Sequence, residues 1–184
     1  MSGRFWEVVG GTNSGGILVR TGPGANSPEE TERLSVGAIL EELESTGERI
    51  RFRRCTGAGP ASGWASLRLK SGKELLAAVE GIWEVVSGAD RGGIVAREGQ
   101  DVTSAMTAER VSFGALVKEL ELVGERLHFQ RLTGTGPLAG WVSLKLQNGK
   151  DLVTRRQAPS PGQKPQAPPP APAGAQAERL NKVP

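Results

Sequence analysis

The feature that most constrains the fold of this chain is an internal duplication at an offset of 77 residues. The segment Trp6-Glu7-Val8-Val9 recurs as Trp83-Glu84-Val85-Val86. Aligning residues 6–79 with residues 83–156 without a gap matches 36 of 74 positions. An ungapped repeat of this length indicates one small structural unit that occurs twice. We therefore expect two domains in tandem rather than one large core.

The expected domains span residues 1–80 and 81–157, and residues 158–184 differ from both in composition. This last segment is dominated by Pro, Ala, Gln and Gly, and it contains few bulky apolar residues. Such a segment buries too little surface to offset the entropy lost on ordering. We therefore expect a disordered Pro/Ala-rich tail after the second repeat.

The composition excludes several classes of protein. The 184 residues include one Cys and one His, so a disulfide framework is impossible and a zinc site is nearly excluded. No apolar run is long enough for a membrane span, and the N-terminus lacks the pattern of a secretory signal. We expect a soluble chain in the cytoplasm or another reducing compartment, or a fragment of a longer protein. The net charge is only +3, and most of the excess lies in the tail.

Within each repeat, short apolar runs alternate with glycine-rich turns. Ile50 and Phe52 alternate with Arg51 and Arg53, which is the period of a half-buried strand. The preceding segment AILEELE, residues 38–44, is compatible with a short helix, but we favour two strands joined near Thr46-Gly47. The pattern predicts five or six short strands per repeat, as in a small barrel or sandwich.

The order of motifs in each repeat is similar to that of a known family. An apolar strand ends at Arg20 or Arg97, a loop leads to Arg-Leu/Val-Ser-x-Gly, and the unit closes with Gly-Trp-Ala/Val-Ser-Leu-x-Leu. This order resembles the bacterial-type SH3-like (SH3b) domain over residues 5–80 and 82–157. In the second repeat a Gly-Gln pair replaces the Gly-Pro pair that follows Arg20 in the first. The loop between Arg20 and Arg33 is longer than the family pattern, and so is the Gly-Pro loop before Trp64.

The resemblance implies a fold and a theme of function. It implies an all-β chain of two tandem SH3-like small β-barrels, followed by the disordered tail. It also implies recognition of peptidoglycan or peptides. We expect a non-catalytic binding or targeting module. We rank a protein or peptide partner first and a glycan second, and the alternative is a structural spacer in a larger multidomain protein.

No arrangement of residues points to catalysis, and we expect no enzyme activity, cofactor or metal. The lone Cys55 aligns with Leu132 of the second repeat, and the lone His128 aligns with Arg51 of the first. We interpret Cys55 as a small core residue and His128 as a surface residue. The glycine-rich loop at residues 57–63 lacks the Gly-Lys-Ser/Thr ending of a phosphate loop and leads into a strand.

The basic stretch RIRFRR at residues 49–54 is the best candidate for contact with nucleic acid. Its second copy, RLHFQR, carries fewer charges. Three acidic residues just upstream, Glu41, Glu42 and Glu44, could pair with these arginines across a hairpin. We therefore expect a charge-paired sheet face, and a weak nucleic-acid binder that uses this strand and the tail is the least favoured alternative.

The candidate ligand residues are those that recur beside the glycine-rich loops and at a strand end. Trp64 and Trp141 are open to two interpretations, core packing or a ligand groove, whereas we expect Trp6 and Trp83 to lie in the core. A strand-end arginine could contact a ligand, or could pair with Glu32 or Glu109 or with another acid. The predicted groove residues are Trp64, Trp141, Arg20, Arg97, Pro60 and Pro137.

Overall fold

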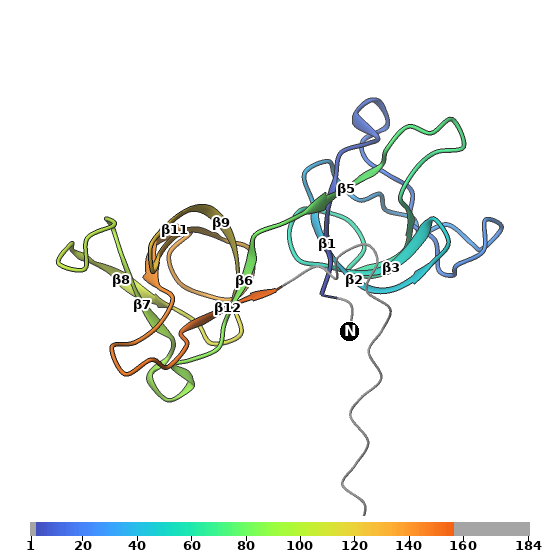
Figure 1. Ribbon diagram of the computed structural model, residues 1–184. Coiled ribbons are helices and arrows are strands. Elements are labelled where there is room, and N and C mark those ends of the chain that lie inside the picture. Colours follow the sequence, from blue (N-terminus) through green and yellow to red (C-terminus); the bar gives the residue numbers. More distant parts are fainter. Residues whose placement is uncertain (1–2, 157–184) are drawn as a thin grey trace, which may run out of the picture.

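The computed structural model describes residues 3–156 and confirms the all-β class (Figure 1). The first repeat forms a five-stranded antiparallel sheet in the order β4-β3-β2-β1-β5. A short 3-10 helix, η1, follows the first strand. The expected tail, residues 158–184, lies outside the described residues. The elements of this repeat are β1 (Phe5–Val8), η1 (Thr12–Ser14), β2 (Ile39–Thr46), β3 (Arg49–Arg54), β4 (Ser62–Ser66) and β5 (Leu76–Val79).

The second repeat forms its own antiparallel sheet of seven strands, in the order β12-β6-β9-β10-β11-β7-β8. Two of these strands, β7 and β8, have only isolated bridges as counterparts in the first repeat, Ile17 to Leu34 and Arg20 to Glu29. The polar stretch that follows Arg97, expected to be a long loop, is therefore partly strand. The elements are β6 (Ile82–Val85), η2 (Ala89–Arg91), β7 (Ile94–Arg97), β8 (Met106–Val111), β9 (Leu116–Val123), β10 (Arg126–Arg131), β11 (Ala139–Ser143) and β12 (Val153–Arg156).

The preference for strands over a helix at residues 38–44 is confirmed. Strands β2 and β3 pair as an antiparallel hairpin around Gly47, whose φ of 59° suits a residue without a Cβ. Ile50 and Phe52 are fully buried, whereas the alternate side chains of β3 face outward. The period of two therefore identified both the strand and its buried face.

Glycines that recur in both repeats allow close approach of backbone segments. Gly16 has a φ of 121°, and a Cβ there would lie 2.0 Å from the carbonyl oxygen of Leu34. Its counterpart Gly93 has a φ of 120°, and a Cβ would lie 2.1 Å from the carbonyl oxygen of Val111. Any side chain at either position would force the two segments apart, so the fold itself requires glycine in both copies.

Each sheet curls around its own apolar core (Figure 1). The side chains that fill these cores come from equivalent positions of the two repeats, with Phe52 and Phe129 the largest that are fully enclosed. The first core contains Val8, Ile17, Val19, Leu34, Ala38, Leu40, Ile50, Phe52, Ala65 and Leu76. The second contains Trp83, Val85, Ile94, Ala96, Val111, Ala115, Val117, Leu127, Phe129, Val142 and Val153.

A third apolar cluster, which we name the inter-repeat cluster, joins the two repeats. Its buried members are Phe5 and Ile39 of the first repeat and Ile82 and Leu116 of the second. Three partly buried residues pack against it: Cys55, Val79 and Leu132. The two sheets therefore meet through side chains and are not joined only by the chain between β5 and β6.

The sequence places Cys55 in the core of its repeat, but the structure places it at the margin of the inter-repeat cluster. Burial there raises the pKa of its thiol to about 11, and the nearby Glu41 carboxylate adds to the shift. The thiol is therefore protonated and unreactive at neutral pH.

Candidate functional site: two equivalent basic grooves

Each repeat carries a groove at the same place in its fold. The first groove has a volume of about 990 Å³ and the second about 850 Å³. Each lies among the segment around the 3-10 helix, the loop after the strand-end arginine, and the turn before the last strand of its repeat. Because equivalent segments line both, the groove is a property of the repeated unit.

Both grooves are strongly basic, although neither repeat is. Residues 6–79 hold nine basic and nine acidic side chains, and residues 83–156 hold ten and nine. Six basic side chains and one acidic side chain line each groove. The fold thus gathers positive charge that is dispersed along the sequence. The basic residues are Arg20, Arg33, Arg49, Arg68, Lys70 and Lys73 in the first groove, and Arg91, Arg97, Arg110, Arg126, Lys145 and Lys150 in the second.

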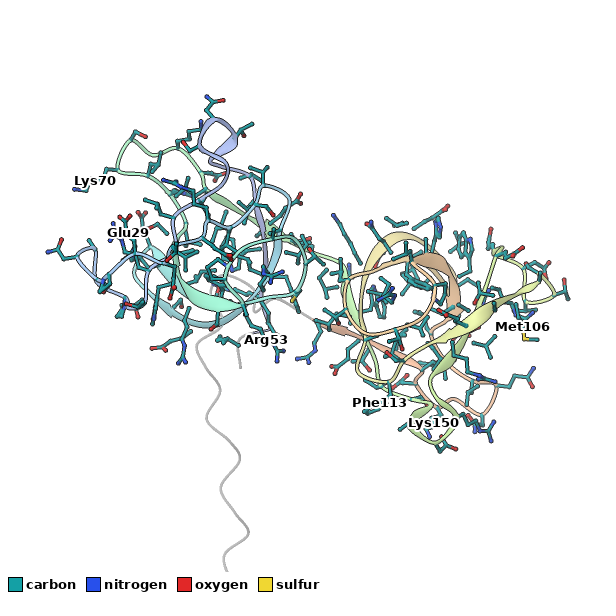
Figure 2. The ribbon with its side chains drawn as sticks, turned by 180° about the vertical axis from the view of Figure 1, so that it is seen from behind. Glu29, Arg53, Lys70, Met106, Phe113 and Lys150 are labelled. Atoms are coloured by element: carbon teal, nitrogen blue, oxygen red, sulfur yellow. The ribbon has the colours of Figure 1, made fainter. Side chains whose placement is uncertain are left out.

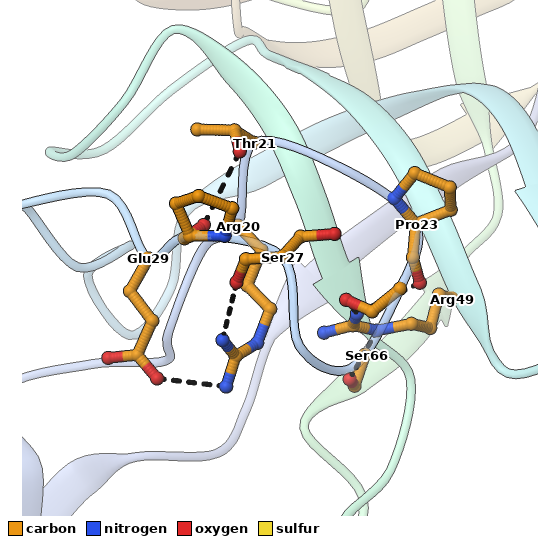
Figure 3. A network of polar contacts seen from close by, with 9 residues as sticks. Arg20, Thr21, Pro23, Ser27, Glu29, Arg49 and Ser66 are labelled. Atoms are coloured by element: carbon orange, nitrogen blue, oxygen red, sulfur yellow. Dashed lines mark hydrogen bonds and ion pairs between the residues drawn. The ribbon is translucent and has the colours of Figure 1, made fainter.

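In the first groove, Arg20 holds the loop that follows it by a hydrogen bond and an ion pair (Figure 3). Its Nη1 donates to the carbonyl oxygen of Ser27 at 2.7 Å, and its Nη2 pairs with Oε1 of Glu29 at 2.8 Å. The sequence offered Glu32 or another acid as a partner for this arginine, and in the structure the partner is Glu29. Arg20 and Glu29 are also bridge partners across the loop, which brings the two side chains together.

Arg49 holds the start of the same loop from strand β3 (Figure 3). Its Nη1 donates to the carbonyl oxygens of Pro23 and Gly24 at 2.9 and 2.6 Å. Its Nε donates to Oγ of Ser66 at 3.1 Å. Partial burial lowers the pKa of the Arg49 guanidinium, and the positive charge of Arg20 lowers it further. Two like charges are therefore held near each other by carbonyl groups.

The second groove repeats this arrangement with one difference. Arg97 Nη1 donates to the carbonyl oxygen of Ser104 at 2.5 Å, as Arg20 does to Ser27. However, Met106 is the strand partner of Arg97 and takes the place of Glu29. Among residues 3–156, Arg97 forms no ion pair of the kind that Arg20 makes with Glu29.

Arg126, the counterpart of Arg49, also holds the loop of its repeat. It donates to the carbonyl oxygens of Gln100 at 2.7 Å and Gly99 at 3.3 Å, and to Oγ of Ser143 at 2.8 Å. Burial and the charge of Arg97 lower the pKa of Arg126, while the nearby carboxylate of Asp101 opposes the shift. Both repeats therefore hold this loop with an equivalent pair of arginines.

Of the six predicted groove residues, Arg20 and Arg97 line the grooves. Trp64 and Trp141 line neither groove and belong to neither core cluster. Trp64 is only 7% exposed, and its strand partner is the outward-facing Arg51. The Trp141 ring is half-buried and stacks on His128, with ring centroids 4.8 Å apart and an interplanar angle of 7°. The two tryptophans thus lie on strands β4 and β11, outside the grooves.

Pro60 and Pro137 are half-buried and line neither groove. Their glycine-rich loops are held by arginines at the ends of β3 and β10. Arg54 donates to the carbonyl oxygens of Gly57 and Pro60, the latter at 3.3 Å. Arg131 donates to the carbonyl oxygen of Gly136 at 3.0 Å in the second repeat. These contacts give the loops a structural role.

The expected charge pairing across the first hairpin is present. Arg53 pairs with Glu41, and Arg51 lies 4.0 Å from Glu44. These contacts engage much of the basic stretch that was the candidate for nucleic acid.

The tryptophans expected in the core behave similarly in both copies. Trp83 lies in the second core, Trp6 packs against the first, and their indole N–H groups donate to Glu119 and Glu42 at 2.8 Å.

Sequence reasoning missed most of the basic lining, although a signal was available. Arg33 and Lys73 recur as Arg110 and Lys150, and Arg68 recurs as a lysine. These duplicated cations lie in different segments and are balanced by acids elsewhere, so the net charge of a repeat conceals them. Within residues 3–156 we find no group of three His, Cys, Asp or Glu side chains able to hold a metal ion, and no helix long and apolar enough to cross a membrane.

The sequence and the structure were compared with protein families, curated proteins and solved structures. No protein-family model matches the sequence. No curated protein matches it either. The solved structure of NlpC2 from Trichomonas vaginalis has a TM-score of 0.29 and 12% sequence identity to this chain. The match covers 82% of this chain and 47% of that one, so the chain spans less than half the length of that protein.

Proposed function

We propose that this chain is a non-catalytic binding module of two SH3-like units, which holds a protein or peptide partner in its two grooves. The observation that supports this proposal most directly is the recurrence of the same groove in both repeats. The motif order that resembles SH3b domains adds to it. A pair of equivalent grooves on one chain suits two segments of one partner, and binding at both sites would strengthen attachment without new contacts.

The lining of the grooves suits a peptide. Apolar side chains recur beside the basic ones, with Leu69 and Leu75 in the first groove and Leu146 and Leu152 in the second. Pockets that combine apolar side chains with a few polar groups bind ligands by burial and orient them by hydrogen bonds. An extended peptide can offer both kinds of group.

The proposal is tested by selecting peptides from a phage-displayed random library with the 184-residue chain as bait. Peptides that bind should lose binding when Leu69→Ser and Leu146→Ser are combined, because both leucines line the grooves. They are 48% and 46% exposed, so the substitutions should leave the fold intact. Loss of affinity would be measured by fluorescence anisotropy with the selected peptides.

The chain offers a matched control for these substitutions. Leu43 and Leu120 are also a duplicated pair, are 38% and 50% exposed, and lie outside both grooves. Leu43→Ser with Leu120→Ser should leave binding unchanged. If the groove variant binds as well as the wild type, whereas Trp64→Ala with Trp141→Ala abolishes binding without unfolding the chain, the ligand lies on the tryptophan face and the groove assignment is wrong.

A second candidate function, a structural spacer, is favoured by the inter-repeat cluster. This cluster joins the repeats through buried apolar side chains, as a part that positions other domains would require. A spacer needs no ligand, so the library selection would enrich no peptide. That outcome would contradict the binding proposal and favour the spacer.

A further inference from the structure

The geometry points to an acidic peptide as the ligand of both grooves, with the second groove binding a carboxylate more strongly than the first. This inference rests on the proposed function and specifies its ligand. The peptide would carry Asp or Glu residues for the basic side chains and apolar residues for the leucines beside them. A basic side chain of the groove is available to a ligand carboxylate where it has no acidic partner within the chain.

Several cations of the grooves have no acidic partner among residues 3–156. Lys70 and Lys73 are exposed, and their side chains make no hydrogen bond or ion pair. Lys150 is equally exposed in the second groove, and Figure 2 labels it together with Lys70. Arg33 and Arg110 each make one long contact, 3.4 Å to a glycine carbonyl oxygen. These groups can accept a carboxylate without breaking an ion pair.

Beside the first groove, Glu29 shows how a carboxylate binds one of the lining arginines. Glu29 reaches Arg20 at 2.8 Å, and the carboxylate is half exposed at 49% of its side-chain surface. In the second groove Met106 occupies the equivalent strand position beside Arg97, and it is 62% exposed. Glu29 therefore competes with a ligand carboxylate for Arg20. In the second groove the acidic neighbour of Arg97 is Asp101, whose Oδ1 accepts hydrogen bonds from Thr103. Among residues 3–156 Asp101 forms no ion pair with Arg97, so a ligand carboxylate has no ion pair to displace there.

The arginine pairs give a second reason to expect an anion. Burial and the nearby charge of Arg20 lower the pKa of Arg49. Burial and the nearby charge of Arg97 lower the pKa of Arg126, and Asp101 opposes this shift. Carbonyl oxygens hold these guanidinium groups in place. A carboxylate placed beside such a pair would gain from both charges, and planar guanidinium groups suit carboxylate geometry.

The grooves do not suit nucleic acid. Binding of single strands combines basic side chains with aromatic rings on which bases stack. No Trp, Phe or Tyr lines either groove. The only ring stack among the described residues joins His128 to Trp141, and neither residue lines the second groove. The grooves combine basic and leucine side chains and have no aromatic ring for a base to stack on, which favours an acidic peptide over nucleic acid.

The first test is the composition of peptides that the 184-residue chain selects from the random library. We expect enrichment of Asp and Glu next to apolar residues, and a loss of affinity of about tenfold when Gln and Asn replace these acids. Lys70→Gln with Lys73→Gln and Lys150→Gln should weaken binding, whereas Arg51→Gln with Lys118→Gln, outside the grooves, should not.

The second test exchanges the acidic side chain that pairs with the strand-end arginine in the first repeat only. Met106→Glu should weaken binding of the selected peptides about fivefold by occupying Arg97, whereas Met106→Gln, similar in size and uncharged, should not. The reciprocal change Glu29→Met should tighten binding at the first groove. Equal effects of Met106→Glu and Met106→Gln would overturn the assignment of Arg97 to the ligand carboxylate.

The outcomes separate this inference from the proposed function. Neutral or basic peptides that still depend on Leu69 and Leu146 would overturn the acidic ligand and retain the binding module. Selection of no peptide would overturn both. Binding of a thymidine oligonucleotide in the grooves more tightly than any selected peptide would also overturn both, and would favour nucleic acid as the partner.

Discussion

Substitution of Phe129 by alanine tests whether the repeats fold as separate units that stabilise each other. Its side chain is fully buried in the second core, so Phe129→Ala should cost that repeat about 3–5 kcal/mol. A unit of 74 aligned residues has a stability of only about 4–11 kcal/mol. The substitution should therefore unfold the second repeat at much lower temperature than in the wild type.

The first repeat should respond through the inter-repeat cluster. When the second repeat unfolds, Phe5 and Ile39 lose their partners Ile82 and Leu116. Complete burial of such a side chain contributes about 1.5–3 kcal/mol. If contacts with the second repeat provide about half of that burial for Phe5 and for Ile39, the free energy of unfolding of the first repeat falls by roughly 2 kcal/mol. Its melting temperature should then fall by roughly 10 °C.

Calorimetry, with the amide NMR signals of each repeat followed during heating, measures both transitions. Phe113→Ala is the control, because Phe113 is in the same repeat but is 56% exposed, and neither transition should move. An unchanged transition of the first repeat in Phe129→Ala would show that the inter-repeat cluster contributes no stability. A single transition in every variant would show that the chain is one cooperative unit.

Three further outcomes are expected. Residues 1–80 expressed alone should give a β-type spectrum and a cooperative melt, and should self-associate in sedimentation experiments because half of the inter-repeat cluster is uncovered; a random-coil spectrum would mean that the repeat cannot fold alone. Trp64→Ala should lower stability to urea by about 3–5 kcal/mol and Trp141→Ala by less, because only Trp64 is almost fully buried; equal losses would contradict this. The native state holds the Cys55 proton more tightly than the unfolded chain, so stability should be retained below pH 9 and decline as the pH rises towards about 11, whereas Cys55→Ala should remove this decline.

The strands were predictable because their signals are local. The alternation of Ile50 and Phe52 with arginines identified β3 and its buried face, and Gly47 marked the turn of the hairpin. Duplication strengthened each inference, because two sequences had to satisfy the same pattern. It also identified glycines such as Gly16, which recurs because a carbonyl oxygen lies too close for a Cβ. Identity between the copies therefore reports constraints on the backbone as much as binding.

The grooves were not predictable in the same way. Arg20, Arg49 and Lys73 come from a bridge segment, a strand and a turn, and only the folded chain brings them to one surface. The sequence offered Glu32 or another acid as the partner of Arg20, without deciding between them. The register of the loop selects Glu29, which has no acidic counterpart in the second repeat. The most informative difference between the repeats was therefore at a position where their sequences disagree.

The inter-repeat cluster has a consequence for assembly. Phe5, Ile39 and Cys55 occupy the same positions in the first repeat as Ile82, Leu116 and Leu132 in the second, and all six meet in one cluster. A patch that meets its own copy is an isologous interface, the kind found in symmetric dimers. The chain thus contains, within one polypeptide, the pairing that a homodimer of single repeats would form. Because the partners are covalently joined, their effective concentration is fixed, and dilution cannot separate them.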